Sequence, residues 1–240
     1  MHINLEMSSV NKTDKIIAQA RKENRKALLE PEAKAICNEY GISVPKFDVA
    51  TNATEASEIA QKTGYPIVMK IVSPEIIHKS DAGGVKVNLK SKAEVAEAFK
   101  TIVANAKKYN AKADIKGVLV QDMAPNGIEV IVGAIKDAQF GQTVMFGLGG
   151  IFVEVLKDVT FRVAPITLDD AKEMITGLKA YPLLKGIRGQ PPADTNAIAK
   201  ILVNVSKLVM EYPEIKELDL NPIMAYAKGV ATVDARIILE

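Results

Sequence analysis

The spacing of apolar residues along the chain switches repeatedly between a helical period and a strand period, which predicts a mixed α/β protein. Helical spacing, with capping residues at several ends, predicts helices over about 30–40, 53–63, 92–106, 168–180 and 194–211. Apolar and β-branched runs predict strands over 44–50, 66–72, 85–90, 117–123, 127–135 and several segments between 143 and 166. The last two runs, LDLNPIMAY and GVATVDARIIL, predict a closing hairpin.

No Ser- or Pro-rich linker and no internal repeat divides these elements. We therefore expect one domain over 21–240, made of two lobes that each contain a β-sheet and packed helices. Lobe 1 covers about 45–120, and lobe 2 covers about 121–240 together with the first helix. Residues 1–20 are expected to form a loosely held tail.

Composition narrows the class of protein. The chain has 240 residues, 48% of them apolar, and 31 basic against 29 acidic residues give a formal charge of only +2. That balance, without a basic stripe, argues against a nucleic-acid-binding protein. One cysteine excludes an internal disulfide, and we find no signal peptide and no apolar run long enough to span a bilayer. A cytoplasmic protein without membrane contact is expected.

The segment SPEIIHKSDAGGV carries the most specific chemistry. His78 is the only histidine besides His2 near the N-terminus, so a role that needs imidazole falls to it. Imidazole can carry a phosphoryl group, and Ser80 with Gly83 and Gly84 could bind an anion through a backbone nest. The other interpretation is an exposed loop histidine with no chemistry.

Lys70 is expected at the end of an otherwise apolar strand. Its ammonium group must leave the core or pair with an anion. Either a bound phosphate or simple snorkelling to solvent satisfies that requirement.

The closing hairpin contains the acidic candidates. Asp219 and Asn221 are two residues apart and so share a strand face, and Asp234 is expected on the paired strand. Carboxylate and amide oxygens suit Mg²⁺, which commonly completes its coordination with phosphate and water. The alternative is an edge hairpin with solvated carboxylates.

Weaker signals lie between the lobes and in lobe 2. The stretch from Gln121 to Met123 could form a hinge whose backbone contacts an adenine, with Glu129 nearby, or it is an ordinary hairpin. GLGG (147–150) precedes no clear helix and is not a Walker-type loop. Arg162 is either a phosphate clamp or part of a structural salt bridge.

In this order, the strand lysine, glycine loop, hinge and LDLNP segment resemble the ATP-grasp fold. From about Arg21 to the C-terminus the chain resembles β subunits of ADP-forming acetyl-CoA synthetases, an acid–thiol ligase family. The segments that carry this resemblance are SPEIIHKSDAGGV, GLGGIFVEVLKDVTFRVAPI and ELDLNPIMAY with VDARI. The chain is also similar to the β subunit of succinyl-CoA synthetase. In this chain the histidine loop replaces the Gly-Arg-Gly segment of that enzyme, and its C-terminal CoA-ligase-type domain has no counterpart here.

The resemblance implies a reaction in which acyl-CoA, phosphate and ADP give the free acid, CoA and ATP. An α subunit with a CoA-binding domain would carry the phosphoryl group on its own histidine and pass it to His78. Asp219 would steady the phosphorylated histidine, and Asn221 and Asp234 would bind Mg²⁺. The implied nucleotide contacts are Lys70, Gln121, Ala124 and Glu129, with Met123 beside the hinge.

An α2β2 heterotetramer is the simplest assembly that this resemblance implies. Two other functions stay open at this point. A generic ATP-grasp carboxylate ligase forms an acyl phosphate directly and needs no histidine, and a nucleotide-sensing subunit would bind ADP or ATP without chemistry. Acyl specificity, the physiological direction and a preference for ADP over GDP do not follow from the sequence.

Overall fold

The computed structural model describes residues 11–150, 157–187 and 191–240. Its helices are α1 (Lys12–Lys22), α2 (Glu30–Glu39), α3 (Ala53–Thr63), α4 (Lys92–Tyr109), α6 (Leu168–Thr176), α7 (Thr195–Glu211) and the short 3₁₀ helix η1 (Tyr181–Lys185). Its strands are β1 (Phe47–Ala50), β2 (Ile67–Val72), β3 (Val85–Leu89), β4 (Gly117–Asp122), β5 (Ile128–Asp137), β6 (Gly141–Leu148), β7 (Val159–Val163), β8 (Ile215–Ala225), β9 (Val230–Thr232) and β10 (Arg236–Leu239). The mixed α/β class is confirmed, whereas part of the strand expected after residue 150 lies outside the described residues.

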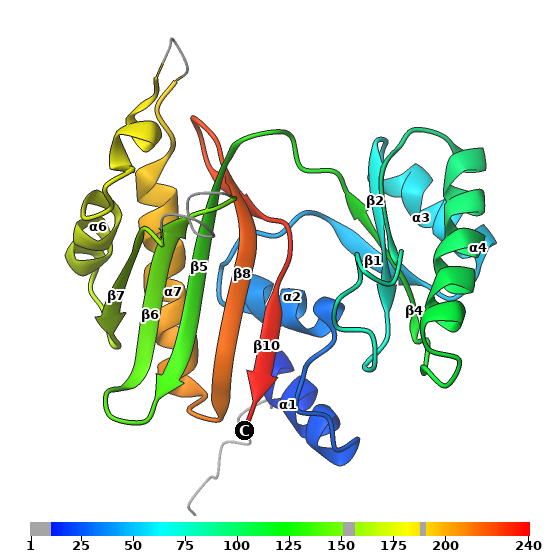
Figure 1. The fold of residues 1–240 in the computed structure, drawn as a ribbon, viewed down its shortest axis with the longest axis horizontal. Coiled ribbons are helices and arrows are strands. Elements are labelled where there is room, and N and C mark those ends of the chain that lie inside the picture. Colours follow the sequence, from blue (N-terminus) through cyan, green and yellow to red (C-terminus); the bar gives the residue numbers. More distant parts are fainter. Residues whose placement is uncertain (1–10, 151–156, 188–190) are drawn as a thin grey trace, which may run out of the picture.

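Two antiparallel sheets form separate lobes (Figure 1). The smaller sheet has the order β1-β4-β2-β3, and α3 and α4 cover one of its faces. The larger sheet has the order β10-β8-β5-β6-β7, with β9 beside β8, and α6 and α7 pack on one face. The linker from β4 to β5 joins the two lobes (Figure 1).

Each lobe has its own hydrophobic core. In lobe 1, buried residues of β2 and β4 pack against the apolar faces of α3 and α4. In lobe 2, alternate residues of β5, such as Val130 and Val132, face the buried stripe of α7. Both sheets thus bury one face under helices, as amphipathic strands require.

The N-terminal region differs from expectation. Instead of a loose tail, residues 12–22 form helix α1, in which Ile17 and Ala20 are buried in the core of lobe 2. The apolar face of this helix is too narrow to be recognised in the largely polar sequence KTDKIIAQARK. Asn11 caps the helix by accepting a hydrogen bond from the Asp14 N–H.

The chain between α1 and α2 then runs along the edge strand β10. The Leu28 N–H donates to the Ile237 carbonyl, and the Leu239 N–H donates to the Lys26 carbonyl. This pairing fixes the start of α2 beside the larger sheet, while α2 also contacts β1 of lobe 1. The N-terminus of α2 is therefore held at the junction of the lobes.

Three local predictions need correction. Lys70 lies in the middle of β2, not at its end. The helix expected over 168–180 is split, because α6 ends at Thr176 and η1 follows. Asp234 lies in the break between β9 and β10 and not on a strand. In the part of the chain that is described, no helix has the length and apolar character needed to cross a membrane.

Candidate functional site

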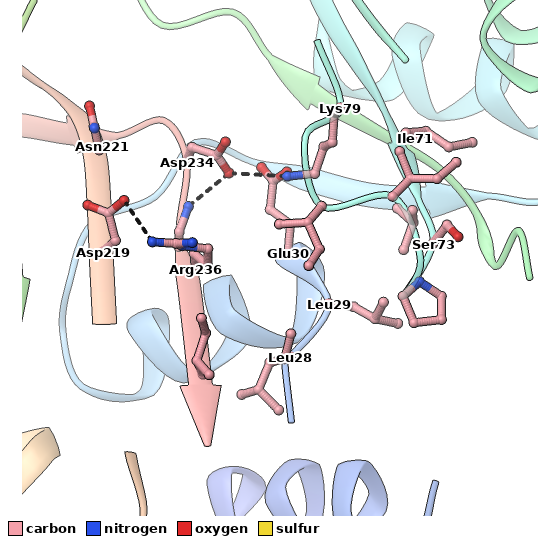
Figure 2. A pocket seen from close by; sticks show the side chains of 17 residues that line it. Leu28, Leu29, Glu30, Ile71, Ser73, Lys79, Asp219, Asn221, Asp234 and Arg236 are labelled. Atoms are coloured by element: carbon pink, nitrogen blue, oxygen red, sulfur yellow. Dashed lines mark hydrogen bonds and ion pairs between the residues drawn. The ribbon is translucent and has the colours of Figure 1, made fainter. Parts of the chain in front are cut away.

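A cavity lies at the lobe junction, where residues from four separate segments meet (Figure 2). Its charged and polar lining comes from the start of α2, the loop after β2, strand β8 and the segment that runs from the β9–β10 connection into β10: Glu30, Ser73, Lys79, Asp219, Asn221, Asp234 and Arg236. The cavity volume is about 140 Å³. Most ligand sites measure roughly 300–1,000 Å³, so this space suits a small anion or ion rather than a whole nucleotide.

Glu30 is the centre of a buried group of charges that we call the lysine cluster (Glu30, Lys34, Lys70 and Lys79). The Glu30 carboxylate lies 2.8 Å from Lys34 Nζ, 2.7 Å from Lys70 Nζ and 3.0 Å from Lys79 Nζ. The Glu30 side chain is 2% exposed and that of Lys34 is fully buried. One carboxylate therefore serves three ammonium groups from both lobes.

Neutral groups complete the cluster. The buried Gln121 side chain accepts a hydrogen bond from Lys34 Nζ and donates to the Val233 carbonyl at 3.4 Å. Lys70 Nζ also donates to the Val233 carbonyl at 3.1 Å. Because Val233 belongs to lobe 2 and Lys70 to lobe 1, these bonds join the lobes as well as satisfying buried polar atoms.

The lysine cluster shifts the pKa values of its members in ways that follow from its geometry. Burial alone would raise the pKa of Glu30, but Lys70, Lys34 and Lys79 hold it far below its ordinary value. Burial lowers the pKa of Lys34 to about 8, since it shares its anion with other cations. Burial opposes the charge of Lys79, yet Glu30 and Asp234 raise its pKa.

A second group, which we call the acidic edge (Asp219, Asn221 and Asp234), lines the same cavity. Buried Leu218 and Leu220 face the core, so Asp219 and Asn221 share the opposite face of β8, as predicted. The Asp219 carboxylate lies 3.8 Å from Arg236, its neighbour in the β8–β10 register. In Figure 2 the two side chains point towards each other.

The acidic edge is less well compensated than Glu30. Desolvation raises the pKa of Asp219, and Arg236 only partly opposes this effect. Desolvation also raises the pKa of Asp234, helped by the nearby Glu30. The nearest ammonium groups to Asp234 lie at 3.6 Å (Lys70) and 3.8 Å (Lys79), longer than the contacts that Glu30 makes.

His78 is exposed in the loop between β2 and β3. Its neighbour Lys79 turns inward, so Figure 2 shows the Lys79 side chain pointing at Glu30 and Asp234. The residues on either side of His78, Ile77 and Lys79, line the cavity, whereas His78 itself does not. The chain's other histidine, His2, lies outside the described residues.

The glycine turn of this loop contradicts the predicted anion nest. The Gly83 N–H donates to the Ser80 carbonyl at 3.0 Å, and the Gly84 N–H donates to the Lys79 carbonyl at 2.8 Å. With Gly83 at φ +60°, this is a Schellman-type closure. A Cβ on Gly84 would stand 2.5 Å from Ile71 Cγ2. Both glycines therefore shape the loop, and Ser80 remains an exposed side chain in it.

The hinge residues are placed differently from the prediction. Gln121 uses its side chain inside the lysine cluster, and the Met123 N–H donates to the Pro66 carbonyl. Ala124 follows in the linker, half-buried. Glu129 is exposed at the start of β5, where its carbonyl accepts from the Gly149 N–H. A nucleotide contact for these residues stays a prediction.

Arg162 is not among the residues around the cavity. It lies on the edge strand β7, where its guanidinium pairs with Glu173 at 3.0 Å and Asp170 at 3.5 Å. Both acids belong to α6. The structure therefore favours the structural salt bridge over the phosphate clamp.

The donor set of the acidic edge fits Mg²⁺ bound together with phosphate. Asn221 and Asp234 offer one amide and one carboxylate oxygen at the same cavity, and Mg²⁺ takes one or two carboxylates plus substrate phosphates. Within the described ranges, no group of three His, Cys, Asp or Glu side chains could hold a metal alone. A metal at this site would need the ligand's own oxygens.

Sequence reasoning missed Glu30, Lys34 and Arg236. The four-residue spacing of Glu30 and Lys34 on a predicted helix was the available signal, because such pairs lie on one face. Their burial could not be read from the spacing, since it depends on how α2 sits between the sheets. Arg236 could have been paired with Asp219 only after the hairpin register was known.

The ATP-grasp domain model matches residues 19–239. The chain is 58% identical to the acetate–CoA ligase [ADP-forming] I subunit beta of Pyrococcus furiosus, over 97% of this chain and all of that one. It is 52% identical to the 4-hydroxybutyrate–CoA ligase [ADP-forming] of Nitrosopumilus maritimus over 94% of this chain, but it spans only 33% of that protein.

A solved structure has the same fold. The acetyl-coenzyme A synthetase 1 of Ca. Korarchaeum cryptofilum superposes with a TM-score of 0.85 and 47% identity, over 95% of this chain and all of that chain. That structure is described as a complex with coenzyme A and Mg-AMPPCP. Its phosphohistidine segment is described as pointing towards the nucleotide-binding site.

Proposed function

The chain belongs to the ATP-grasp family, among the β subunits of ADP-forming acetate–CoA ligases, and we propose that its His78 passes a phosphoryl group to ADP. It is the nucleotide-handling subunit of a ligase that converts acyl-CoA, ADP and phosphate into free acid, ATP and CoA. ADP and ATP are its nucleotide substrates. We assign the contacts to the acyl group of the substrate to the partner subunit.

The observation that carries the proposal is the meeting of His78's loop, the lysine cluster and the acidic edge at one cavity. Four cationic groups (Lys34, Lys70, Lys79 and Arg236) stand against three carboxylates (Glu30, Asp219 and Asp234) at or next to the cavity, so one positive charge is left over for a phosphate. An exposed imidazole beside such a site can receive a phosphoryl group from outside and present it inward.

The transfer has two balanced steps. A neutral imidazole nitrogen of His78 attacks the phosphorus of the donor phosphohistidine, the donor's P–N bond breaks with its electron pair going to the donor nitrogen, and a P–N bond forms on His78. A β-phosphate oxygen of ADP then attacks that phosphorus. The second P–N bond breaks, ATP leaves, and His78 returns to its neutral form.

The chain's own residues position the groups and neutralise charge. Lys70 and Lys79 supply positive charge next to the cavity, and Asp219 accepts a hydrogen bond from the incoming phosphohistidine ring, which fixes its orientation. Asn221 and Asp234 would hold Mg²⁺, which supplies charge neutralisation on the phosphate oxygens. Gln121, Met123, Ala124 and Glu129 are proposed to contact the rest of the nucleotide.

An α-type partner is part of this proposal. Relatives such as the 4-hydroxybutyrate–CoA ligase contain about twice as much additional chain as this chain provides, because the match spans only 33% of that protein. Other relatives are separate β subunits of this chain's length. We propose that a separate subunit supplies the CoA-binding part and the donor histidine, in an α2β2 assembly in the cytoplasm.

His78→Ala tests the role of the imidazole. With the partner subunit present, the variant should lose ATP formation while ADP still binds, because His78 is exposed and removing it leaves the fold intact. ATP formation is followed by a coupled assay and ADP binding by calorimetry. Turnover at the wild-type rate would remove the relay role and favour a carboxylate ligase that forms acyl phosphate directly.

Labelling separates the ligase from a nucleotide sensor. Wild-type complex incubated with γ-labelled ATP should carry acid-labile, base-stable label on this chain, as a phosphoramidate does, and His78→Ala should carry none. A wild-type chain that never takes up label under turnover conditions would favour the sensor.

A further inference from the structure

The loop that carries His78 is fixed to lobe 1 at two points. Ile76, two residues before the histidine, and Ala82, four residues after it, are both buried in the lobe 1 core. The glycine turn closes the loop behind them through backbone hydrogen bonds. These contacts set the loop's place within its own lobe but say nothing of its place relative to the other lobe.

Lys79 supplies the connection across the junction. Its Nζ lies 3.0 Å from the Glu30 carboxylate of α2 and 3.8 Å from Asp234 (Figure 2). Lys79 follows His78 directly, and adjacent Cα atoms lie only about 3.8 Å apart. Any movement of the Lys79 backbone is therefore shared by His78.

Glu30 is a rigid anchor for this contact. It occupies the first turn of α2, where the helix N-terminus stabilises a carboxylate. Lys34 and Lys70 hold the same carboxylate at 2.8 and 2.7 Å, and the preceding linker is paired to β10. With only 2% of its side chain exposed, Glu30 has almost no surface with which to touch a substrate.

We propose that Glu30 is a positioning residue which, through Lys79, sets where His78 stands relative to the acidic edge of the opposite lobe. This inference rests on the proposed relay through His78. Phosphoryl transfer needs the reacting atoms about 3–3.5 Å apart, and a misplacement of about 1 Å costs on the order of 10²-fold in rate. A contact that fixes the loop across the junction can therefore control the rate without touching the phosphoryl group.

The test measures two quantities in the same variants. The full chain, assembled with its partner, is mixed with γ-labelled ATP and quenched over time to give the rate of His78 phosphorylation, and calorimetry gives the Kd for ADP. Lys79→Gln should slow phosphorylation by on the order of 10²-fold. Its Kd for ADP should rise by no more than about tenfold, the cost of one lost charge near the phosphates, so the rate should fall much further than the affinity.

Three further variants test whether the contact between Lys79 and Glu30 is itself responsible. Lys79→Arg keeps a cation that reaches Glu30 and should recover most of the rate. Glu30→Gln should slow phosphorylation in the same way as Lys79→Gln, and the double variant should be no slower than the worse single one, because both changes remove one contact. If Glu30→Gln does not fold, the Lys79 variants alone decide the question.

Glu32→Gln is the matched control. Glu32 lies on the same helix, forms a bidentate ion pair with Arg25 at 2.8 Å and does not line the cavity. This variant should keep the wild-type phosphorylation rate.

Several results would overturn the inference. They are a wild-type rate in Lys79→Gln, a loss of ADP affinity in parallel with the rate, multiplicative losses in the double variant, or an equal loss in Glu32→Gln. An unlabelled wild-type chain would instead overturn the proposed function itself, so the two failures are distinguishable.

Discussion

The lysine cluster and the acidic edge line one cavity, yet their carboxylates have opposite environments. Glu30 has three ammonium groups within 3.0 Å, and its pKa is far below the ordinary value despite its burial. Asp219 and Asp234 have their nearest cations at 3.6–3.8 Å, and desolvation raises the pKa of both. The first carboxylate is saturated with counter-charge and the other two are not.

The two environments suit two different roles, attachment of the lobes to each other and binding of a ligand. A buried carboxylate that already has three ammonium groups in contact gains little from a further cation, and losing the carboxylate leaves buried charges uncompensated in a low-dielectric interior. An undercompensated carboxylate gains from a cation or a donor brought by a ligand. We therefore assign lobe attachment to the lysine cluster and ligand contact to the acidic edge.

The largest test of this division is Glu30→Gln in the free chain. Removing the charge leaves Lys34 buried without an anion and Lys70 with only Asp234 at 3.6 Å, and breaking a buried pair costs about 3–5 kcal/mol. For a chain of this size, 1 kcal/mol corresponds to about 2–4 °C, so thermal unfolding should show a Tm lower by about 6–20 °C. Circular dichroism during heating measures it.

Glu32→Gln again provides the control for that experiment. Its ion pair with Arg25 is more exposed, with 20% of the Glu32 side chain accessible, and solvent screens it. The drop in Tm should be clearly smaller than for Glu30→Gln. Equal drops would mean that the lysine cluster has no special part in joining the lobes.

The lysine cluster could be predicted only in part from the sequence. The strands, most helices and the two-lobed arrangement could be predicted because apolar spacing reports which faces are buried. The requirement that Lys70 meet an anion could be predicted too, from its apolar strand. The identity of that anion could not, because Glu30 lies 40 residues earlier and reaches Lys70 only through the packing of α2 between the lobes.

The acidic edge was more accessible to prediction, for a local reason. Asp219 and Asn221 are two residues apart on one strand, so the strand period alone places them on one face. The glycine turn was predicted wrongly, because the sequence gives only the residue types of the turn and not its hydrogen bonds. Gly83 and Gly84 indicate an unusual backbone, but only the structure shows that their N–H groups are already bonded to carbonyls.

The second test, Asp234→Asn, addresses the acidic edge. Loss of one charged ligand oxygen should weaken binding of Mg-ADP by about 10–100-fold, the cost of a hydrogen bond or contact to a charged group. The Tm should change by no more than about 4 °C, because Asp234 is 37% exposed at its side chain and Glu30 still holds both lysines. Calorimetry with and without Mg²⁺, beside thermal unfolding, measures both.

A titration of ADP without Mg²⁺ is the internal control, and there the variant and the wild type should bind alike. If Asp234→Asn loses stability as severely as Glu30→Gln, Asp234 belongs to the structural group. The comparison between the two regions would then fail at that residue.

The smallest effect is expected for Asp219→Asn, and it has the opposite sign to that of Glu30→Gln. Desolvation raises the folded-state pKa of Asp219 above its unfolded value, so the folded chain binds the extra proton more tightly. Stability therefore falls as pH rises from the unfolded pKa through the folded one, and at pH 7 the full cost of ionisation is present. Asparagine has no charge to desolvate.

In chelator-treated buffer at pH 7, Asp219→Asn should accordingly raise the Tm by about 1–3 °C. The gain is limited because 34% of the side chain is exposed and Arg236 already offsets part of the cost. The difference should shrink as the pH falls towards 4 and vanish below the ordinary pKa, where both forms are neutral. A variant that is less stable than wild type at pH 7 would show that the Arg236 contact outweighs desolvation, and Asp219 would then be a structural partner like Glu30 rather than a residue kept undercompensated for a ligand.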